Sequence, residues 1–312
     1  MHGLSTVFRK ELADHLGGKR FIILLALIVA VGLSSVYAAA GAISEQAAQT
    51  PSFVFLKLFT VSKGILPPFV TFVSFLGPLI GIALGFDAIN REETEGTLSR
   101  VLSQPIYRDS LINAKFLAGL TAIAIMLVSI ALIVSGVGLR LLGVAPEIEE
   151  MWRMLIFLGI SVIYIAFWMS LGVLFSIVFK RMATSALAGI GLWIFLAFFM
   201  PLIAGVAANA AIPVDQQSPP ETIIKHYRAE QMVGRISPTA LFDEATITTL
   251  SPNVRTLSPV LQEQVKGMVP GPLPIGQSLL IAWPHLTSLI ALTFICFGIS
   301  YAMFMRREIR GP

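Results

Sequence analysis

The sequence predicts an all-α membrane protein with six transmembrane helices. Of its 312 residues, 55% are hydrophobic and only 13% are charged, whereas soluble domains carry about 25% charged residues. Several apolar runs reach the roughly 20 residues that a helix needs to cross a bilayer. These runs do not alternate between apolar and polar residues, as the strands of a membrane β-barrel do. We therefore expect helices, which satisfy their own backbone hydrogen bonds inside lipid.

The first 20 residues predict a short amphipathic helix that lies in the membrane interface. Leu4, Phe8, Leu12 and Leu16 recur every four residues, and charged side chains occupy the other faces. A signal peptide is the alternative. The segment before the apolar run contains acidic residues, however, and that run exceeds the roughly 7–15 residues of a signal peptide. We therefore favour the interfacial helix.

Six apolar runs predict the spans, and a loop joins the first two. The predicted spans cover residues 21–43, 66–86, 111–142, 154–179, 183–212 and 279–305. The second span contains Gly77, Gly81 and Gly85 at four-residue spacing. Small residues at this spacing form a smooth stripe that lets another helix approach closely, so we expect helix packing there. The alternative is that glycine is simply common in membrane helices.

Residues 213–278 predict a small folded cap outside the membrane. This segment is polar and holds half of the chain's 18 prolines. Its Ser-Pro pairs favour helix starts, because serine caps a helix and proline fits the first turn. We expect helices over 238–250 and 259–268, and a third over 221–233. The predicted domains are an interfacial helix (1–20), five spans with a coupling region at 87–115 (21–212), the cap (213–278), and the sixth span with its tail (279–312).

The distribution of Lys and Arg predicts the orientation. The N-terminus, the 87–115 loop, the 180–181 turn and the C-terminus hold 13 of these residues, and the two short loops opposite hold four. Because cytoplasmic loops are enriched in Lys and Arg, we expect both termini in the cytoplasm of a multi-pass plasma membrane protein. The pI near 9.3 reflects these loops. We expect no nucleic-acid binding, since no basic tract is dense enough.

The 87–115 loop concentrates charge in a chain that has little. Nine ionisable residues fall there: Asp87, Arg91, Glu92, Glu93, Glu95, Arg100, Arg108, Asp109 and Lys115. Asn90 and Glu93 are spaced as a capping box, so we expect a helix over 91–102 that Pro105 ends. Its apolar face is Leu98, Val101 and Leu102. A solvated loop is the alternative, but five acids exceed what charge sorting requires. We interpret this helix as a docking element that receives force from a soluble partner.

This loop resembles that of the ABC-2 type transporter permeases. The resemblance rests on an acidic cluster before Gly-Thr-Leu at 92–98, a Leu-Ser-x-Pro-(x)2-Arg turn at 102–108, Lys-Phe-Leu at 115–117, Phe-Arg-Lys-Glu-Leu at 8–12 and Ile-Ser-Pro at 236–238. Ala114 replaces the family's usual glycine before the lysine. Within the family, the chain is most similar to the subfamily that includes the permease of nitrous-oxide-reductase maturation.

The resemblance implies a homodimeric permease that is driven by two copies of an ATP-binding cassette ATPase subunit. It implies export, and the apolar spans favour a hydrophobic or amphipathic substrate. The partner subunits would bind ATP and Mg, so we expect no cofactor in this chain. The coupling residues implied are Arg91, Glu92, Glu93, Glu95, Gly96, Thr97, Leu98, Val101 and Leu102. A membrane scaffold or assembly factor without transport is the alternative.

The sequence offers no catalytic or metal-binding motif. The chain contains no G-x-x-x-x-G-K-[ST] loop, which predicts that it does not bind ATP itself. The four histidines are far apart and show no metal-ligand spacing. The predicted spans also carry few ionisable residues away from their ends, which disfavours a proton-coupled carrier. We therefore expect a permease subunit and not an enzyme.

Overall fold

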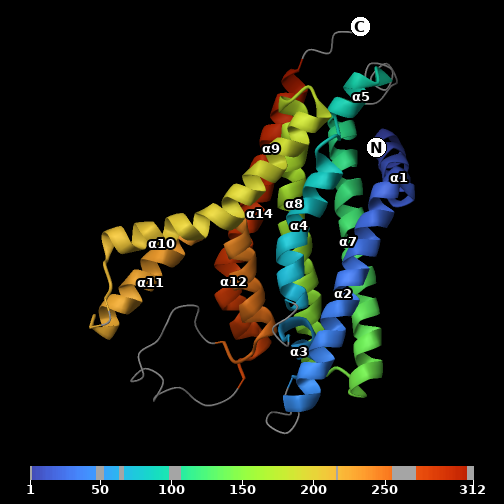
Figure 1. The fold of residues 1–312 in the computed structure, drawn as a ribbon. Helices are drawn as coiled ribbons and strands as arrows, with labels where there is room; N and C mark the ends of the chain where they lie inside the picture. The colour runs from blue at the N-terminus through green and yellow to red at the C-terminus, as the bar shows by residue number, and fades with distance from the viewer. Residues whose placement is uncertain are drawn as a thin grey trace. The chain divides into compact units, whose positions relative to one another are not determined.

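The computed structural model describes residues 2–46, 53–62, 67–97, 107–215, 217–254 and 272–307. Among these residues every regular element is a helix, which confirms the predicted fold class (Figure 1). Six segments are long and apolar enough to cross a membrane, namely Lys19–Ile43, Phe69–Thr94, Arg108–Leu142, Ile148–Val178, Met182–Ala211 and Ile275–Arg306. The chain forms two compact units, one of Met1–Ile190 with Ile290–Pro312 and one of Gly191–Leu289.

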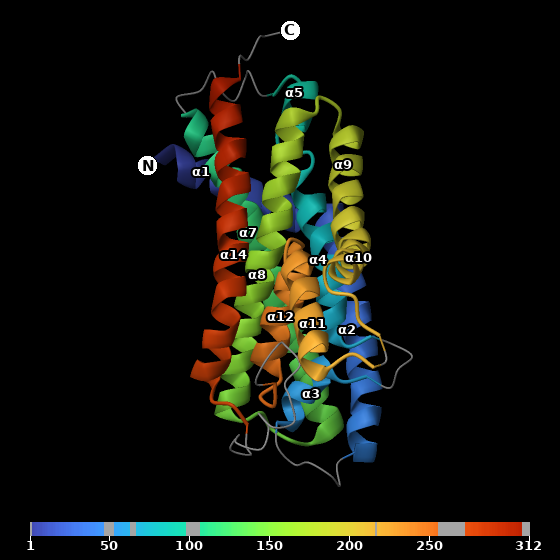
Figure 2. The same cartoon turned by 90° about the vertical axis from the view of Figure 1, so that its left-hand side faces the viewer.

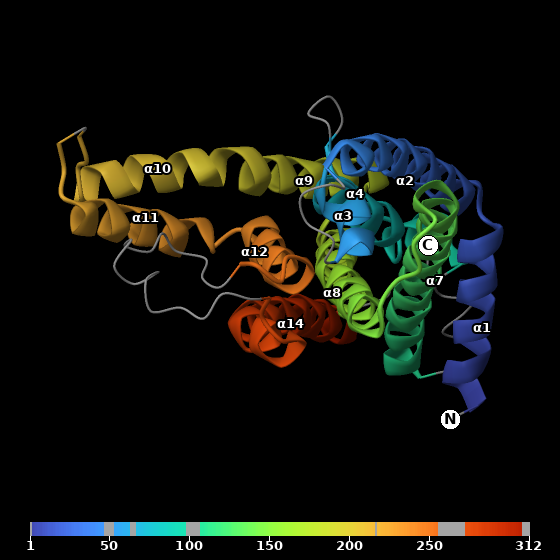
Figure 3. The same ribbon diagram turned by 90° about the horizontal axis from the view of Figure 1, so that it is seen from below.

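The first unit is a bundle of long helices. It contains α1 (His2–Gly17), α2 (Lys19–Gln46), α3 (Val54–Thr60), α4 (Phe69–Gly85), α5 (Asn90–Thr94), α7 (Arg108–Leu142), α8 (Ile148–Val178), most of α9 (Met182–Ile194) and the second half of α14 (Ile275–Arg306). α1 packs along α7, and α4 packs along α8 (Figures 1 and 3). Val7 of α1 is buried in a cluster with Leu111, Ile177 and Phe304.

The three glycines of the second span lie on the face of α4 that packs against α8. A Cβ atom at Gly77 would lie 3.1 Å from Cγ1 of Ile165, and one at Gly81 would lie 2.5 Å from the carbonyl oxygen of Ile165. A Cβ atom at Gly85 would meet the carbonyl oxygen of Met169. Because two of these neighbours are backbone atoms, a larger residue would force the two helices apart.

The predicted loop between the first two spans contains a helix, α3, which was not expected. Its Phe55, Leu56, Leu58 and Phe59 are buried. The Glu150 carboxylate of α8 accepts hydrogen bonds from the backbone N–H groups of Phe55 at 2.9 Å and Leu56 at 3.3 Å. Glu150 also completes a capping box with Glu147. This box starts α8 at Ile148, six residues before the predicted start at residue 154.

The second unit holds the helices between residues 191 and 289. A π-helical turn (Phe195–Phe199) leads into α10 (Met200–Ala211), and α11 (Pro220–Gly234) packs along α10 (Figures 1 and 3). α12 (Pro238–Leu250) has the predicted bounds, and α11 exceeds the predicted range by one residue at each end. The predicted helix over 259–268 lies outside the described residues. Glu244 of α12 pairs with Arg235 at 2.9 Å and His285 at 2.6 Å, which ties α12 to α11 and to the start of α14.

Candidate functional site

The charged loop begins with α5, a helix of five residues that follows the end of α4. The prediction of a continuous helix over 91–102 is wrong, because α5 ends at Thr94 and the chain turns at Glu95 and Gly96. Gly96 has a φ of 67°, a left-handed conformation that glycine adopts at little cost and that commonly ends a helix. Leu98, Val101 and Leu102, the predicted apolar face, lie outside the described residues.

The prediction that Asn90 caps this helix is also wrong. Ile89 occupies the N-cap position, and Asn90 is fully buried. The backbone N–H groups of Ile89 and Asn90 donate to the Ser176 hydroxyl of α8, at 2.8 and 3.1 Å. The free N–H groups at the start of α5 are therefore satisfied by a neighbouring helix, which fixes α5 to α8.

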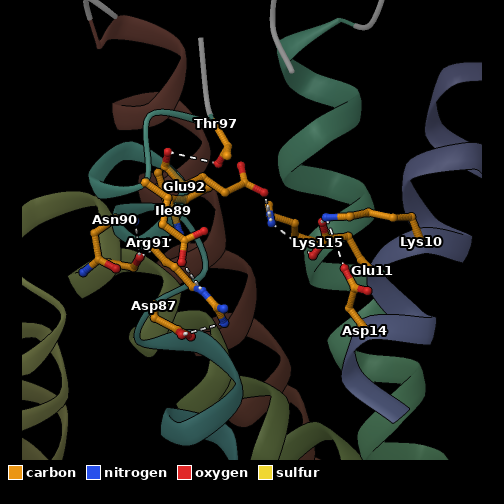
Figure 4. A network of polar contacts seen from close by, with 12 residues as sticks. Lys10, Glu11, Asp14, Asp87, Ile89, Asn90, Arg91, Glu92, Thr97 and Lys115 are labelled. Carbon is orange, nitrogen blue, oxygen red and sulfur yellow. Dashed lines mark hydrogen bonds and ion pairs between the residues drawn. The ribbon is translucent and has the colours of Figure 1, made fainter. Parts of the chain in front are cut away.

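A chain of buried ion pairs fixes α5 to two further helices (Figure 4). Nζ of Lys115, on α7, lies 2.8 Å from Glu92 of α5 and 3.0 Å from Glu11 of α1. The three side chains are only 9%, 14% and 11% exposed, in that order. The second carboxylate oxygen of Glu92 is buried and has no hydrogen-bond partner in the described part of the chain. Glu92 therefore depends on Lys115 for charge compensation.

The pKa values of α1 reflect the same ion pairs. Burial favours a raised pKa for Glu11, but Lys115 and Lys10 outweigh burial and hold the pKa below its ordinary value. Burial likewise favours a lowered pKa for Lys10, yet Glu11 and Asp14 raise it. Burial lowers the pKa of His15, which favours the neutral ring. Glu11 is thus ionised at neutral pH.

The outward face of α5 carries the remaining charges. Arg91, Glu93, Glu95 and Gly96 are exposed, whereas Glu92 and Thr97 are half-buried. Arg91 pairs with Glu95 at 2.9 Å, and Glu93 pairs with Arg307 of the chain's C-terminal segment at 2.8 Å. Four of the predicted coupling residues are therefore open to solvent. Glu92 instead turns toward the bundle, and the Thr97 hydroxyl donates to the Glu92 carbonyl at 3.2 Å.

Sequence reasoning did not find the partners of this loop. Glu11, Ser176 and Arg307 come from segments that are far from it in the chain. Asp87, at the end of α4, also pairs with Arg20 of α2 at 2.6 Å. Lys115 is the one hint of these partners in the sequence, because a lysine next to an apolar run requires an acidic partner when it is buried.

Comparison with known proteins identifies the family. The sequence matches the family described as ABC-2 family transporter protein over residues 5–309. The chain is 30% identical to the Probable ABC transporter permease protein NosY of Pseudomonas aeruginosa over 219 residues, which cover 68% of this chain and 71% of that protein. It is 32% identical to the protein of the same name from Stutzerimonas stutzeri over 152 residues, 46% of this chain and 50% of that protein.

This match spans nearly all of the chain, including α1, the charged loop and all six apolar helices. Members of this family are membrane components of transporters and are not themselves catalytic. The chain belongs to the ABC-2 transporter family and is a membrane-spanning permease.

Proposed function

We propose that this permease is driven by a separate ATP-binding cassette subunit, which contacts the outward face of α5 and the residues that follow it. The observation that carries the proposal is the attachment of α5. It continues from α4, its N–H groups bond to Ser176 of α8, and Glu92 reaches Lys115 of α7. A force applied to α5 therefore reaches three membrane-spanning helices at once.

In this proposal the complex contains two ATPase subunits and two copies of the permease in the plasma membrane. ATP and Mg are bound by the ATPase subunits, and the permease termini face the cytoplasm. The poorly buried spans support a second copy, because the most apolar stretch is 28% buried in the first span and 17% buried in the fifth and sixth, against 50–67% in the other three. Exposed apolar residues of α2, such as Ile23 at 63% and Tyr37 at 77%, are available to lipid or to another permease.

We propose export of a hydrophobic or amphipathic substrate, in keeping with the apolar character of the spans. The alternative function is that of a membrane scaffold or assembly factor. A scaffold retains its partners but neither stimulates ATP hydrolysis nor moves a substrate. Measurement of ATPase activity with and without the permease in nanodiscs therefore separates the two functions.

The test of the contact is co-purification of the permease with the ATPase subunit. Leu98→Asp places a charge on the predicted apolar face, and loss of a buried anchor commonly costs more than about 1–2 kcal/mol. We expect at least about a tenfold loss of bound ATPase, with normal membrane insertion. Glu95→Gln removes one exposed charge, so its effect should be milder and should shrink at high salt.

A conservative Leu98→Met variant is the matched control and should retain the partner. If Leu98→Asp binds the ATPase at the wild-type level and stimulates it normally, the partner contacts another part of the permease. The 180–181 turn is then the next candidate, because it also carries cytoplasmic charge in the predicted topology.

A further inference from the structure

A groove of about 540 Å³ separates the second half of α14 from α7 and α8, within the first unit. Leu120 of α7, Ile163 of α8 and Phe294 of α14 contribute to its walls. At one point the groove is bridged by aromatic rings, where the centroids of Phe116 and Phe297 lie 4.3 Å apart. Within this unit, Figure 2 shows the second half of α14 running alongside α8. This inference does not depend on the proposed function.

The groove is unlike a space that water fills. Among the described residues, Asn113 and Thr293 are the polar side chains that line it, and the others are apolar. A buried water needs about two to four polar partners, and dry apolar cavities in proteins are nearer 150 Å³. An empty space of this size would also deprive its walls of dispersion contacts. Hydrocarbon is therefore the occupant that satisfies these walls.

The groove is continuous with the surface that the helices present to lipid. Leu117 and Phe294 line it, yet they are 41% and 71% exposed. On α7 the lining extends from Asn113 to Leu120. At 1.5 Å per residue, this stretch lies about 8–18 Å from the start of α7. With the start of α7 at the edge of a hydrocarbon core about 30 Å thick, the groove would lie at the depth of a single leaflet.

Charge near the groove favours a phospholipid over a neutral lipid. The start of α7 meets the end of α14, where the Arg108 guanidinium donates to the Arg307 carbonyl at 3.1 Å. Arg306 is exposed beside them. In the described part of the chain, Arg307 pairs with Glu93 at 2.8 Å, whereas neither Arg108 nor Arg306 forms an ion pair with an acid, so this end of the groove suits a phosphate group.

We propose that the groove holds one acyl chain of a phospholipid, whose phosphate lies near Arg108 and Arg306. The acyl chain completes the packing of α14 against α7 and α8. The lipid is then a bound component of the folded permease, and it exchanges more slowly than the lipids that surround the protein. Each methylene buried in the groove strengthens binding by about fourfold.

The test is a substitution on one wall of the groove that fills the space with a larger side chain. Ile163→Trp places an indole in the space of the acyl chain, and Leu155→Trp, on an outward part of the same helix, is the matched control. Each full-length permease is purified in mild detergent, stripped of lipid and titrated with dioleoylphosphatidylglycerol. Native mass spectrometry counts the bound lipids. Thermal unfolding reports the resulting stability.

We expect wild type and Leu155→Trp to bind one lipid saturably and to melt at a higher temperature when it is bound. Ile163→Trp should bind at least about tenfold more weakly, since the indole displaces several methylenes. Leu120→Phe fills less of the groove and should weaken binding if Ile163→Trp does not fold. Binding by wild type that never saturates, or wild-type affinity in the folded groove variants, would overturn the proposal.

Discussion

Replacement of Lys115 by methionine should destabilise the permease more than removal of the whole ion-pair chain. Nζ of Lys115 lies within 3.0 Å of both Glu11 and Glu92, and the three side chains are nearly buried. Without the lysine, Glu92 loses its cation, and Glu11 keeps only its pair with the exposed Lys10. Removal of one partner of a buried pair costs about 3–5 kcal/mol. The triple variant with Glu11→Gln, Glu92→Gln and Lys115→Met removes all three buried charges together, and we expect a cost below about 2 kcal/mol.

Lys10→Met is the matched control, because Lys10 also pairs with Glu11, at 3.0 Å, but is 60% exposed. Solvent screens such a pair, so its loss should cost about 0–1 kcal/mol. The assay is denaturant unfolding in detergent micelles at pH 7. A Lys115→Met variant as stable as wild type, or a triple variant as unstable as the single one, would refute the role assigned to Lys115.

The stability difference between wild type and Lys115→Met should depend on pH. The pKa of Glu11 is below its ordinary value in the folded protein, so the pair stabilises the fold above the unfolded pKa of about 4.3. This stabilisation is lost as the pH falls through the folded pKa. In Lys115→Met the Glu11 carboxylate lacks this cation and gains a proton more readily. The stability gap between wild type and variant should therefore narrow as the pH is lowered from 7 toward about 4.5.

Three further predictions concern the rest of the chain. Gly81→Leu should lower the free energy of unfolding in detergent by about 1–3 kcal/mol, because the new Cβ atom would lie 2.5 Å from the Ile165 carbonyl oxygen. Gly159→Leu is the control: the space around Gly159 is open, so this change should leave the stability unaltered. Glu150→Gln replaces the carboxylate that accepts hydrogen bonds from the backbone N–H groups at the start of α3 with a neutral side chain that has a single acceptor oxygen. Backbone hydrogen exchange in α3 should therefore accelerate, while exchange in α8 should stay slow. In a Cys296→Ser background, Gln217→Cys should react with an impermeant maleimide from outside the cell and Tyr107→Cys only from the cytoplasm; the reverse pattern would invert the predicted topology.

The sequence was most informative where a property depends on neighbouring residues. The apolar runs predicted the six membrane-spanning helices, and the Ser237-Pro238 pair predicted the start of α12. Two predictions failed because a distant residue decides the outcome. α3 is capped by Glu150, about 95 residues away, and Ser176 of α8 supplies the cap predicted for Asn90. Neither link leaves a pattern in the local sequence.

The acids in and next to α5 have two roles: one attaches the helix to the bundle, and others are exposed to solvent. These two roles explain why the loop contains several acids. Glu92 faces the bundle and holds Lys115, whereas Glu95 is exposed and held only by Arg91. A single acid cannot satisfy a buried lysine and also remain available to solvent. An element that is anchored to the bundle and also exposed to solvent therefore needs acids on both faces. Substitution of Glu92 should then lower stability first, while substitution of Glu95 should alter partner binding and leave the fold intact.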